Sequence, residues 1–193
     1  MSKRCIVTIG RQYGSGGRHV GELLSQRLGF PFYDQPELIA AARRAEDYDD
    51  VRAFFEEDPA DTLLTALAAR ERSRWSEAPF RHIRDVVGAG SCVLVGRCGS
   101  VIFRDDPTAA RVFFHARPAY RVERIARMEG CSARRAGERM EETDRSRGSF
   151  HRYYTGEPWG VAEGYDLSLD SGLLGVEGST EFLMEYLKRR GLI

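Results

Sequence analysis

A cluster of glycines near the start of the chain has the residue types and spacing of a phosphate-binding loop. It lies in the stretch VTIGRQYGSGGRHVGELLSQRLGF (7–30), between an apolar run and an amphipathic one. Backbone N–H groups at the start of a helix bind anions well, because the helix dipole favours negative charge and glycine allows a close approach. The cation beside the glycines is Arg18, which stays protonated and can contact two phosphate oxygens at once. The candidate phosphate contacts are Gly14, Ser15, Gly16, Gly17, Arg18 and His19.

The loop departs from the usual phosphate-loop pattern, G-x-x-x-x-G-K-[ST], at two positions. Gly16 fits the pattern, but Arg11 stands at its first glycine and Gly17 stands at its lysine. Gly10 and Arg18 each lie one residue from the place where a glycine and a cation are expected. A second interpretation is therefore open, in which the loop is a tight strand-to-helix turn that binds no ligand. The histidine after the cation is equally suited to face solvent.

Two further polar residues follow short apolar runs. Asp34 comes after FPFY (30–33), and Arg97 follows SCVLV (91–95) closely. If these runs are parallel strands, both side chains lie at the carboxyl edge of the sheet, where open α/β sheets bind ligands. An arginine that leaves a buried strand is unfavourable unless it meets an anion. Asp34 is also suited to a helix N-cap or a turn, and Arg97 to a structural salt bridge.

A third group of candidates lies in and beside the stretch EETDRSRGSFHRYYTG (141–156). Phosphoryl transfer depends on positioning and on cations around the transferring group. The arginines concerned are Arg139, Arg145, Arg147 and Arg152. On one continuous helix Arg145 and Arg152 would share a face while Arg147 pointed elsewhere. We therefore expect a break near Gly148 that lets two or three of these arginines converge.

The elements that must position these residues alternate between short apolar runs and amphipathic stretches, which is typical of a parallel sheet with helices on its faces. The expected strands are residues 5–9, 30–33, 91–95, 110–116 and 165–170. The expected helices are residues 18–28, a helix starting near Pro36, and residues 62–87, 118–128, 132–143 and 178–190. We predict a single three-layer α/β/α domain over residues 1–193, with a helical excursion at 46–88.

Composition argues against several other classes of protein. The formal net charge is zero, so nothing global indicates a nucleic-acid or membrane partner. The cysteines and histidines have no metal-ligand spacing, so we expect no metal site built by the protein alone. No apolar run approaches the roughly 18 residues of a membrane span, and no signal peptide is recognisable. With thiols that we expect to be reduced, these features predict a cytoplasmic protein.

Taken together, the stretches RQYGSGGR, PFYD, VGRCG and YYTGEPWG resemble the cytidylate kinase-like family, a divergent branch of the P-loop nucleoside monophosphate kinases. The resemblance runs from Ile6 to the final helix with few gaps, and in that branch the glycine loop also ends in G-G-R. It implies a P-loop kinase fold in which residues 129–160 form a helical lid. It also implies ATP and Mg²⁺ as cofactors and a nucleoside monophosphate, CMP or dCMP, as the acceptor.

The resemblance assigns roles to individual residues. They are Arg18, Arg145 and Arg147 as catalytic cations, Asp34 and Arg97 at the acceptor, and Arg121 and Arg124 beside the ATP base. Arg121 and Arg124 are equally suited to a solvated helix face that pairs with Glu123 and Glu129.

Two residues depart from the family pattern. Cytidylate kinases carry an aspartate directly after the arginine that corresponds to Arg97, whereas this chain has Cys98. Many P-loop kinases end the preceding strand with an acid that organises Mg²⁺, whereas this chain has Val95. The acceptor base is therefore open, and magnesium would be held mostly by phosphates and water unless Asp34 contributes. Two alternatives follow: a kinase of another phosphorylated or hydroxylated metabolite, and a regulatory protein that binds a nucleotide without turnover.

Overall fold

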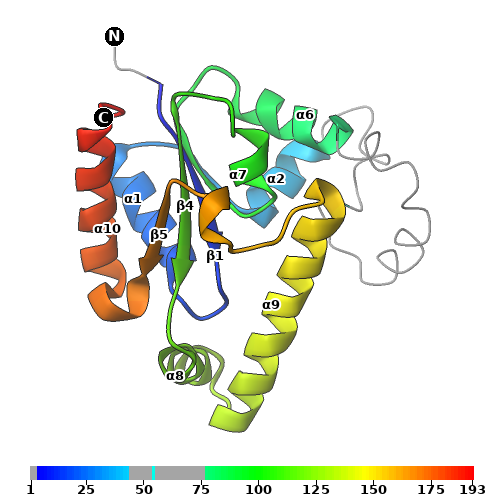
Figure 1. Ribbon diagram of the computed structural model, residues 1–193, viewed down its shortest axis with the longest axis vertical. Helices are drawn as coiled ribbons and strands as arrows, with labels where there is room; N and C mark the ends of the chain where they lie inside the picture. Colours follow the sequence, from blue (N-terminus) through cyan, green and yellow to red (C-terminus); the bar gives the residue numbers. More distant parts are fainter. Residues whose placement is uncertain (1–3, 44–53, 55–76) are drawn as a thin grey trace.

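The computed structural model describes residues 4–43, 54 and 77–193, and it contains a five-stranded sheet (Figure 1). The strands are β1 (Ile6–Arg11), β2 (Phe32–Tyr33), β3 (Cys92–Val95), β4 (Ala109–His115) and β5 (Leu167–Asp170). Their order is β2-β3-β1-β4-β5, and each neighbouring pair is parallel. This confirms the predicted α/β class and the five-stranded parallel sheet.

The central strands are apolar because helices cover both faces of the sheet. Ile6, Val7 and Ile9 of β1 are at most 1% exposed. Ile9 pairs with Val95 of β3 and Val112 of β4, so the carboxyl ends of these strands lie at one edge. The segments that follow β1 and β3 at this edge contain most of the residues that the sequence proposes for a site.

Helices cover both faces of the sheet (Figure 1). They are α1 (Gly17–Leu28) and α10 (Ser171–Arg189) on one face, and α2 (Gln35–Ala42), α6 (Glu77–Val87) and α7 (Gly99–Ile102) on the other. Successive side chains of a strand point to opposite faces, so Ile6 packs with Leu38 in one core and Val7 packs with Leu24 in the other. The predicted three-layer arrangement is therefore present.

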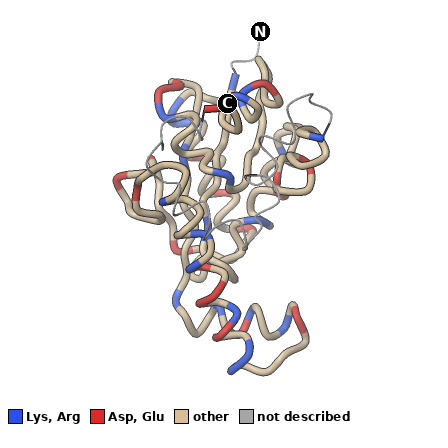
Figure 2. The backbone as a smooth tube through the Cα atoms, turned by 90° about the vertical axis from the view of Figure 1, so that its right-hand side faces the viewer, with Lys and Arg blue, Asp and Glu red and all other residues tan. Residues whose placement is uncertain are grey.

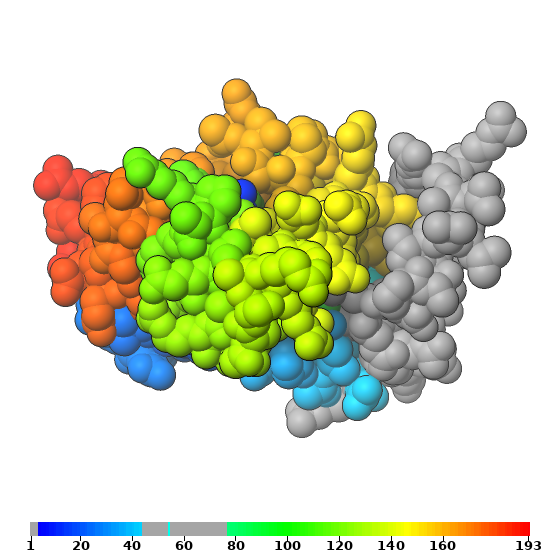
Figure 3. Space-filling view, turned by 90° about the horizontal axis from the view of Figure 1, so that it is seen from below, coloured from blue at the N-terminus to red at the C-terminus, as the bar shows by residue number. Residues whose placement is uncertain are grey.

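Two further helices, α8 (Pro118–Glu129) and α9 (Ala133–Thr155), form a hairpin beyond the carboxyl ends of the strands (Figure 1). Gly130 ends α8 in the left-handed conformation, and the Ser132 side chain caps α9 by accepting from the Arg135 N–H. Figure 2 shows charged residues of both signs along this hairpin. Seen from below, its atoms cover the middle of the molecule (Figure 3). We call this hairpin the lid.

The expected break near Gly148 is wrong. Helix α9 runs from Ala133 to Thr155, and Gly156 ends it in the left-handed conformation (φ 74°). A glycine inside a helix costs about 1 kcal/mol relative to alanine, which tertiary packing can override. Here α9 buries Met140 and His151 on its inner face, on both sides of the glycine in sequence. The arginines of α9 are therefore placed by one uninterrupted helical repeat.

Two further helices were expected at residues 178–190 and 62–87. Helix α10 begins at Ser171 rather than at residue 178, and it contains a kink at Gly175 (φ 67°). Of the helix predicted over 62–87, the structure describes Glu77–Val87 as α6. The remainder of that helix and the acidic stretch 46–61, and so most of the predicted excursion, lie outside the described residues.

Among the described helices, none combines the length and apolar character that a membrane span requires.

Candidate functional site

The glycine loop joins β1 to α1 and has the backbone shape that its sequence predicts. Gly14 (φ 78°) and Gly16 (φ 91°) adopt the left-handed conformation, which other residues reach only with strain. A Cβ atom at Gly14 would lie 2.9 Å from the carbonyl oxygen of Arg121, so this glycine also makes room for the lid. Helix α1 begins at Gly17, and the N–H groups of a first turn have no acceptor within the helix. The loop therefore presents backbone N–H donors at the start of α1.

Ser15 holds the loop in this shape. Its buried hydroxyl donates to the carbonyl oxygen of Gln12 (2.9 Å) and accepts from the N–H of Gly17 (3.3 Å). The hydroxyl of Ser171 lies 2.7 Å from the carbonyl oxygen of Ser15 and 3.0 Å from that of His115. These hydroxyl groups tie the loop to the end of β4 and to the start of α10.

The loop lines a pocket that is open to solvent. Besides the loop residues, this loop pocket is lined by Arg11, Arg18, His19, Arg124 and Arg147. The predicted cations Arg18 and Arg147 therefore share one pocket with the glycines. Arg11, which the sequence analysis did not select as a ligand, lines it as well.

The guanidinium group of Arg18 is held by two carboxylates. Its Nε lies 2.7 Å and its Nη2 2.6 Å from Oδ2 of Asp34, and its Nη1 pairs with Glu22. Burial disfavours the charge, but the hydrogen bonds and charges of Asp34 and Glu22 outweigh it and raise the pKa of Arg18. The side chain is 47% exposed. The cation predicted to contact phosphate is therefore already engaged with acids.

Asp34 lies at the carboxyl edge of the sheet, as predicted, and it is the N-cap residue of α2. Its backbone N–H donates to Oε2 of Glu37 (3.2 Å), and its side chain is almost fully buried. Oδ2 binds Arg18, whereas Oδ1 has no hydrogen-bond partner among the described residues. The Asp34 side chain also forms a capping box with Glu37 at the start of α2. The contact with an acceptor stays a prediction.

The chain makes a sharp turn after β3. Three consecutive residues are left-handed: Gly96 (φ 84°), Arg97 (φ 52°) and Cys98 (φ 57°). For the last two this conformation costs on the order of 1–3 kcal/mol each, and such strain gathers at functional sites. Arg97 is only 6% exposed, and its guanidinium lies 5.0 Å from the ring centre of Phe150 in the lid. The predicted acceptor arginine therefore lies between the sheet edge and the lid.

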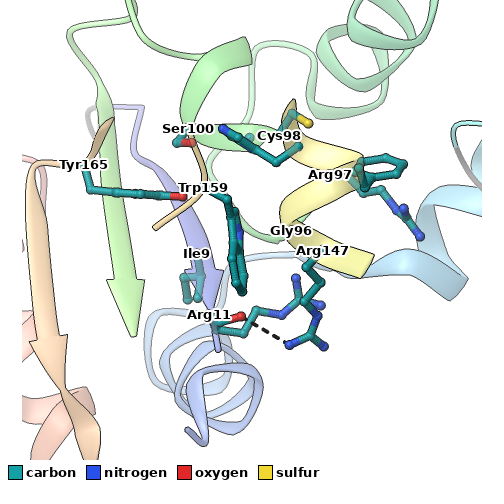
Figure 4. A pocket seen from close by; sticks show the side chains of 13 residues that line it. Ile9, Arg11, Gly96, Arg97, Cys98, Ser100, Arg147, Trp159 and Tyr165 are labelled. Carbon is teal, nitrogen blue, oxygen red and sulfur yellow. Dashed lines mark hydrogen bonds between the residues drawn. The ribbon is translucent and has the colours of Figure 1, made fainter. Parts of the chain in front are cut away.

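Two more pockets, each of about 440 Å³, lie beside this turn. The His151 pocket extends from the end of β1 to Trp159 and Tyr165 (Figure 4). His151 of α9 lines it as well. The Gln35 pocket is lined mainly by polar side chains, namely Arg11, Gln35, Arg97, Thr143, Ser146 and Arg147. Arg11 and Arg147 line both of these pockets and the loop pocket. The three pockets therefore meet at this pair of arginines.

Arg147 reaches the loop from α9. Its Nη1 donates to the carbonyl oxygen of Arg11 (3.2 Å; Figure 4), and its guanidinium lies 5.5 Å from the ring centre of Tyr13. Arg145 is exposed, and the three pockets are lined without it. Side chains two positions apart on a continuous helix differ in direction by about 200°. The structure therefore brings Arg147 to the site and leaves Arg145 outside it.

Arg121 and Arg124 take different positions. Arg121 is 5% exposed, its Nε donates to the carbonyl oxygen of Tyr13 (2.7 Å), and it forms an ion pair with Asp144. The solvated-face interpretation is therefore wrong for Arg121, which instead connects the loop to the lid. Arg124 lines the loop pocket, with its Cζ 3.6 Å from where a Cβ of Gly16 would lie. Its contact with an ATP base stays a prediction.

Tyr13 is the residue by which the lid holds the loop. Its N–H donates to Oδ1 of Asp144 (2.7 Å), its carbonyl oxygen accepts from Arg121, and its hydroxyl donates to Glu129. Burial, followed by the hydrogen bond to Glu129, raises the pKa of Tyr13. Residues of α8 and α9 thus bind each polar group of Tyr13, and the loop and lid form one hydrogen-bonded unit.

The sequence analysis missed Arg11 and Tyr13 as site residues. Arg11 carried a signal, because an arginine stands where the phosphate-loop pattern has its first glycine. Tyr13 carried none, since its lid partners lie 108 to 131 residues away in sequence.

Known proteins resemble the chain over most of its length. A model of the cytidylate kinase-like family matches residues 6–173. A cytidylate kinase from Aeropyrum pernix is 28% identical over 182 residues, which cover 93% of this chain and 96% of that protein. A solved structure of an uncharacterized protein from Eubacterium ventriosum has a TM-score of 0.77 and 26% identity, covering 97% of this chain and 99% of that one. A shikimate kinase from Bacteroides thetaiotaomicron has a TM-score of 0.51 and 15% identity, covering 95% and 98%, which shows a common fold.

The family match includes each segment of the candidate site. It begins at Ile6, the first residue of β1, and it contains the glycine loop, the turn at Gly96 and both lid helices. Because the match spans most of the chain and the site lies wholly inside it, the chain belongs to the cytidylate kinase-like family.

Proposed function

We propose that the protein transfers a phosphoryl group from ATP to a nucleoside monophosphate, with CMP or dCMP as the acceptor. The observation that carries this proposal is the meeting of three pockets at Arg11 and Arg147. A donor bound on the glycine loop and an acceptor bound beside the turn after β3 would face each other at this pair. The family match and the relative from Aeropyrum pernix support the same class of reaction.

On the donor side, the loop and the first turn of α1 would bind the phosphates of ATP. Gly14, Gly16 and Gly17 allow the backbone to approach the ligand closely. Arg124 lines the same pocket from the lid, where it could contact the ATP base or its phosphates.

On the acceptor side, the Gln35 pocket suits a phosphate group. Arg11, Arg97 and Arg147 supply guanidinium groups, which bind phosphate oxygens in pairs. Asp34 lies at the same edge of the sheet and would border the nucleoside. The acceptor phosphate is already ionised near neutral pH, so the reaction needs no strong general base.

The residues present fit a magnesium ion that is held mainly by its ligand. The described residues contain no group of three His, Cys, Asp or Glu side chains that could hold a metal, and β3 ends in Val95. Mg²⁺ that accompanies nucleotides needs only one or two carboxylates, because phosphates and water complete its octahedron. Oδ1 of Asp34 is the buried carboxylate oxygen that could contribute. Such an ion would neutralise charge on the phosphates.

The lid would keep water away from the transferring group. Its two helices cover the carboxyl edge of the sheet (Figure 3), and closed lids of this kind limit hydrolysis of the donor. The negative charge of the transferring phosphoryl group would be stabilised by Arg11 and Arg147.

All four cysteines are free thiols, which suits a reducing compartment such as the cytoplasm.

Two observations favour a second candidate, a protein that binds a nucleotide without turnover or phosphorylates another metabolite. Cys98 stands where cytidylate kinases have an aspartate, and it is buried at the edge of the His151 pocket. Val95 offers no carboxylate for magnesium. The change at Cys98 bears on the choice of acceptor, and the change at Val95 bears on magnesium binding. The acceptor is therefore the feature to test.

The test measures ADP formation from Mg·ATP with a panel of nucleoside monophosphates and small hydroxylated acids, using two matched variants. Gly16 and Gly29 are left-handed glycines at opposite ends of α1, with φ of 91° and 66°. A Cβ at either position meets no backbone atom within 3.4 Å. Gly16→Ala and Gly29→Ala should each lower stability by about 1 kcal/mol. Turnover should fall at least tenfold in Gly16→Ala and stay within twofold in Gly29→Ala.

Turnover with CMP or dCMP that responds in this way supports the proposal. ATP binding without ADP formation on any acceptor would overturn it in favour of the regulatory protein. Turnover with a hydroxylated acid alone would place the protein among the other metabolite kinases.

A further inference from the structure

The two departures of the glycine loop from the usual pattern are a matched pair. The pattern has glycine at its first position and lysine at its seventh. This chain has arginine at the first, Arg11, and glycine at the seventh, Gly17. A cation and a glycine have therefore changed places across the loop.

The structure shows why these two positions depend on each other. A Cβ atom at Gly17 would lie 2.8 Å from the Cβ of Arg11 and 3.0 Å from the Cβ of Phe114. Contacts under 3.0 Å do not occur between real Cβ atoms without movement of the backbone. The Arg11 side chain therefore starts over the bare backbone of Gly17, where the Cβ of Arg11 makes the tightest contact with a side chain at 17 and the Cβ of Phe114 the next.

A second glycine makes room for the other end of the Arg11 side chain. Nη1 of Arg11 lies 2.4 Å from where a Cβ of Gly96 would be, and Gly96 has a φ of 84°. The side chain thus extends from the floor of the loop pocket at Gly17 to the turn after β3. Along this course it lines the loop pocket, the Gln35 pocket and the His151 pocket. It spans the region between the expected donor and acceptor.

Arg18, the cation that the sequence favours, has a different setting. Its guanidinium binds Asp34 and Glu22, and nearly half of the side chain is exposed. To contact a phosphate, Arg18 would have to give up at least part of an ion pair with the buried carboxylate of Asp34. Arg11 lines the same pocket from the end of β1, and its backbone carbonyl oxygen accepts from Arg147.

We propose that Arg11 supplies the cation that a usual phosphate loop takes from its lysine, and that Gly17 is glycine because the Arg11 side chain crosses it. The ligand is the polyphosphate tail of a nucleoside triphosphate. This inference rests on the proposed function, since it takes the loop to be a polyphosphate site. A guanidinium from the end of β1 stays charged and can contact two phosphate oxygens, beside Arg147 at the junction of the pockets.

The first experiment measures binding of inorganic tripolyphosphate by calorimetry and ADP formation from Mg·ATP, with unfolding midpoints as a check on folding. Arg11→Met keeps an apolar side chain over Gly17 and removes the charge. It should weaken tripolyphosphate binding at least tenfold and lower turnover about 10²–10³-fold, as loss of one transition-state donor does elsewhere. Arg11→Lys, which keeps a charge, should recover part of both. Arg18→Ala should lower each less than tenfold.

The second experiment tests the exchange itself. Gly17→Lys in the wild-type background should lower the unfolding midpoint, because the new side chain collides with Arg11. In an Arg11→Gly background the same lysine should lower the midpoint less, because only the 3.0 Å approach to the Cβ of Phe114 remains. Arg11→Gly/Gly17→Lys should bind tripolyphosphate at least tenfold more tightly than Arg11→Gly. Equal destabilisation by Gly17→Lys in both backgrounds, without recovered binding, would overturn the exchange.

Failure of this inference can be told apart from failure of the proposed function. Wild-type binding and turnover in Arg11→Met, together with loss of both in Arg18→Ala, would assign the cation to Arg18. A wild-type protein that forms no ADP with any acceptor would overturn the proposed kinase. Loss of tripolyphosphate binding in Arg11→Met would still support the role of Arg11 in that case. A wild-type protein that binds no tripolyphosphate and forms no ADP would overturn both.

Discussion

The glycine loop and helix α9 both carry candidate phosphate contacts, but they are held in place in different ways. The loop is shaped largely by neighbours in sequence, such as the hydroxyl of Ser15 with Gln12 and Gly17. Helix α9 meets the loop only after the chain has passed through three strands, and it does so through the side chains of Asp144 and Arg147. In the loop the backbone itself is the expected ligand, whereas in α9 the side-chain direction decides which residue takes part.

This difference shows what each region tolerates. The loop depends on the conformation of particular glycines, so a single added Cβ atom can close it. The lid helix depends on its rotation about its own axis, so residues two positions apart, such as Arg145 and Arg147, have unlike roles. A comparison of matched variants in the two regions can test this view.

Replacing Arg147 by alanine should have the largest effect. Removal of a cation from the junction of the pockets should lower turnover about 10³-fold, as for arginines that stabilise transferring phosphoryl groups. Arg145→Ala should change turnover less than threefold, because the side chain is exposed and outside the pockets. Steady-state ADP formation checks both. Similar losses in the two variants would mean that both arginines reach the phosphates when the ligand is bound.

Breaking the link between lid and loop should mainly lower stability. Arg121→Met leaves the Asp144 carboxylate, whose side chain is only 18% exposed, without its cation. Loss of one partner of a buried pair costs about 3 kcal/mol, and urea unfolding should show this. The matched control is Arg134→Met, which breaks the pair with Glu138 at 81% and 61% exposure and should cost under about 0.5 kcal/mol. Equal effects would show that the lid is not anchored through Arg121.

Filling the glycines of α9 should be favourable. A Cβ at Gly148 would lie 3.9 Å from Trp159, and one at Gly137 would lie 3.9 Å from Val122, both ordinary contacts. Gly148→Ala and Gly137→Ala should each raise the free energy of unfolding by about 0.5–1 kcal/mol, with turnover within twofold. A loss of turnover confined to Gly148→Ala would show that the helix must bend there during catalysis.

The smallest expected effect concerns pH. Burial, with a contribution from Arg104 and against that of Glu157, lowers the pKa of His151 below its ordinary value of about 6.5. The unfolded chain therefore takes up a proton at a pH where the folded chain does not, so stability is highest above about pH 6.5 and decreases as the pH falls towards the lowered pKa. In His151→Asn the unfolding midpoint should depend less on pH between about 7.5 and 5.5. An unchanged dependence would assign the effect to other groups.

Much of the site could be predicted because its signals are local. The glycines of the loop require their conformation wherever the chain goes, and an apolar run before them indicates a buried strand. For Asp34 the sequence offered a helix N-cap as an alternative to an acceptor contact. The N-cap could be predicted because capping involves residues next to one another in sequence. The position of Arg97 followed from the rule that ligands bind at the carboxyl ends of parallel strands.

The errors arose where a residue's role depends on a distant partner. The solvated-face interpretation of Arg121 was wrong, because this side chain is buried against Tyr13 and Asp144, while its place beside an ATP base stays a prediction. The break near Gly148 followed from the need to bring several arginines together, whereas the helix uses one of them for the pockets and leaves it uninterrupted. The contact of Arg18 with phosphate stays a prediction, but the sequence did not show that its guanidinium binds Asp34 and Glu22.

The amino-acid sequence by itself determined the parallel sheet, the glycine loop at the end of β1 and the supply of arginine as the cation. Periodicity and glycine conformation act over a few residues, so the order of residues is enough to specify them. Only the tertiary structure decided which arginines gather at the pockets, Arg11 and Arg147 rather than Arg145, and that Tyr13 joins loop to lid. These choices depend on the rotation of one helix against a sheet edge more than a hundred residues away in sequence, and that packing is a property of the whole fold.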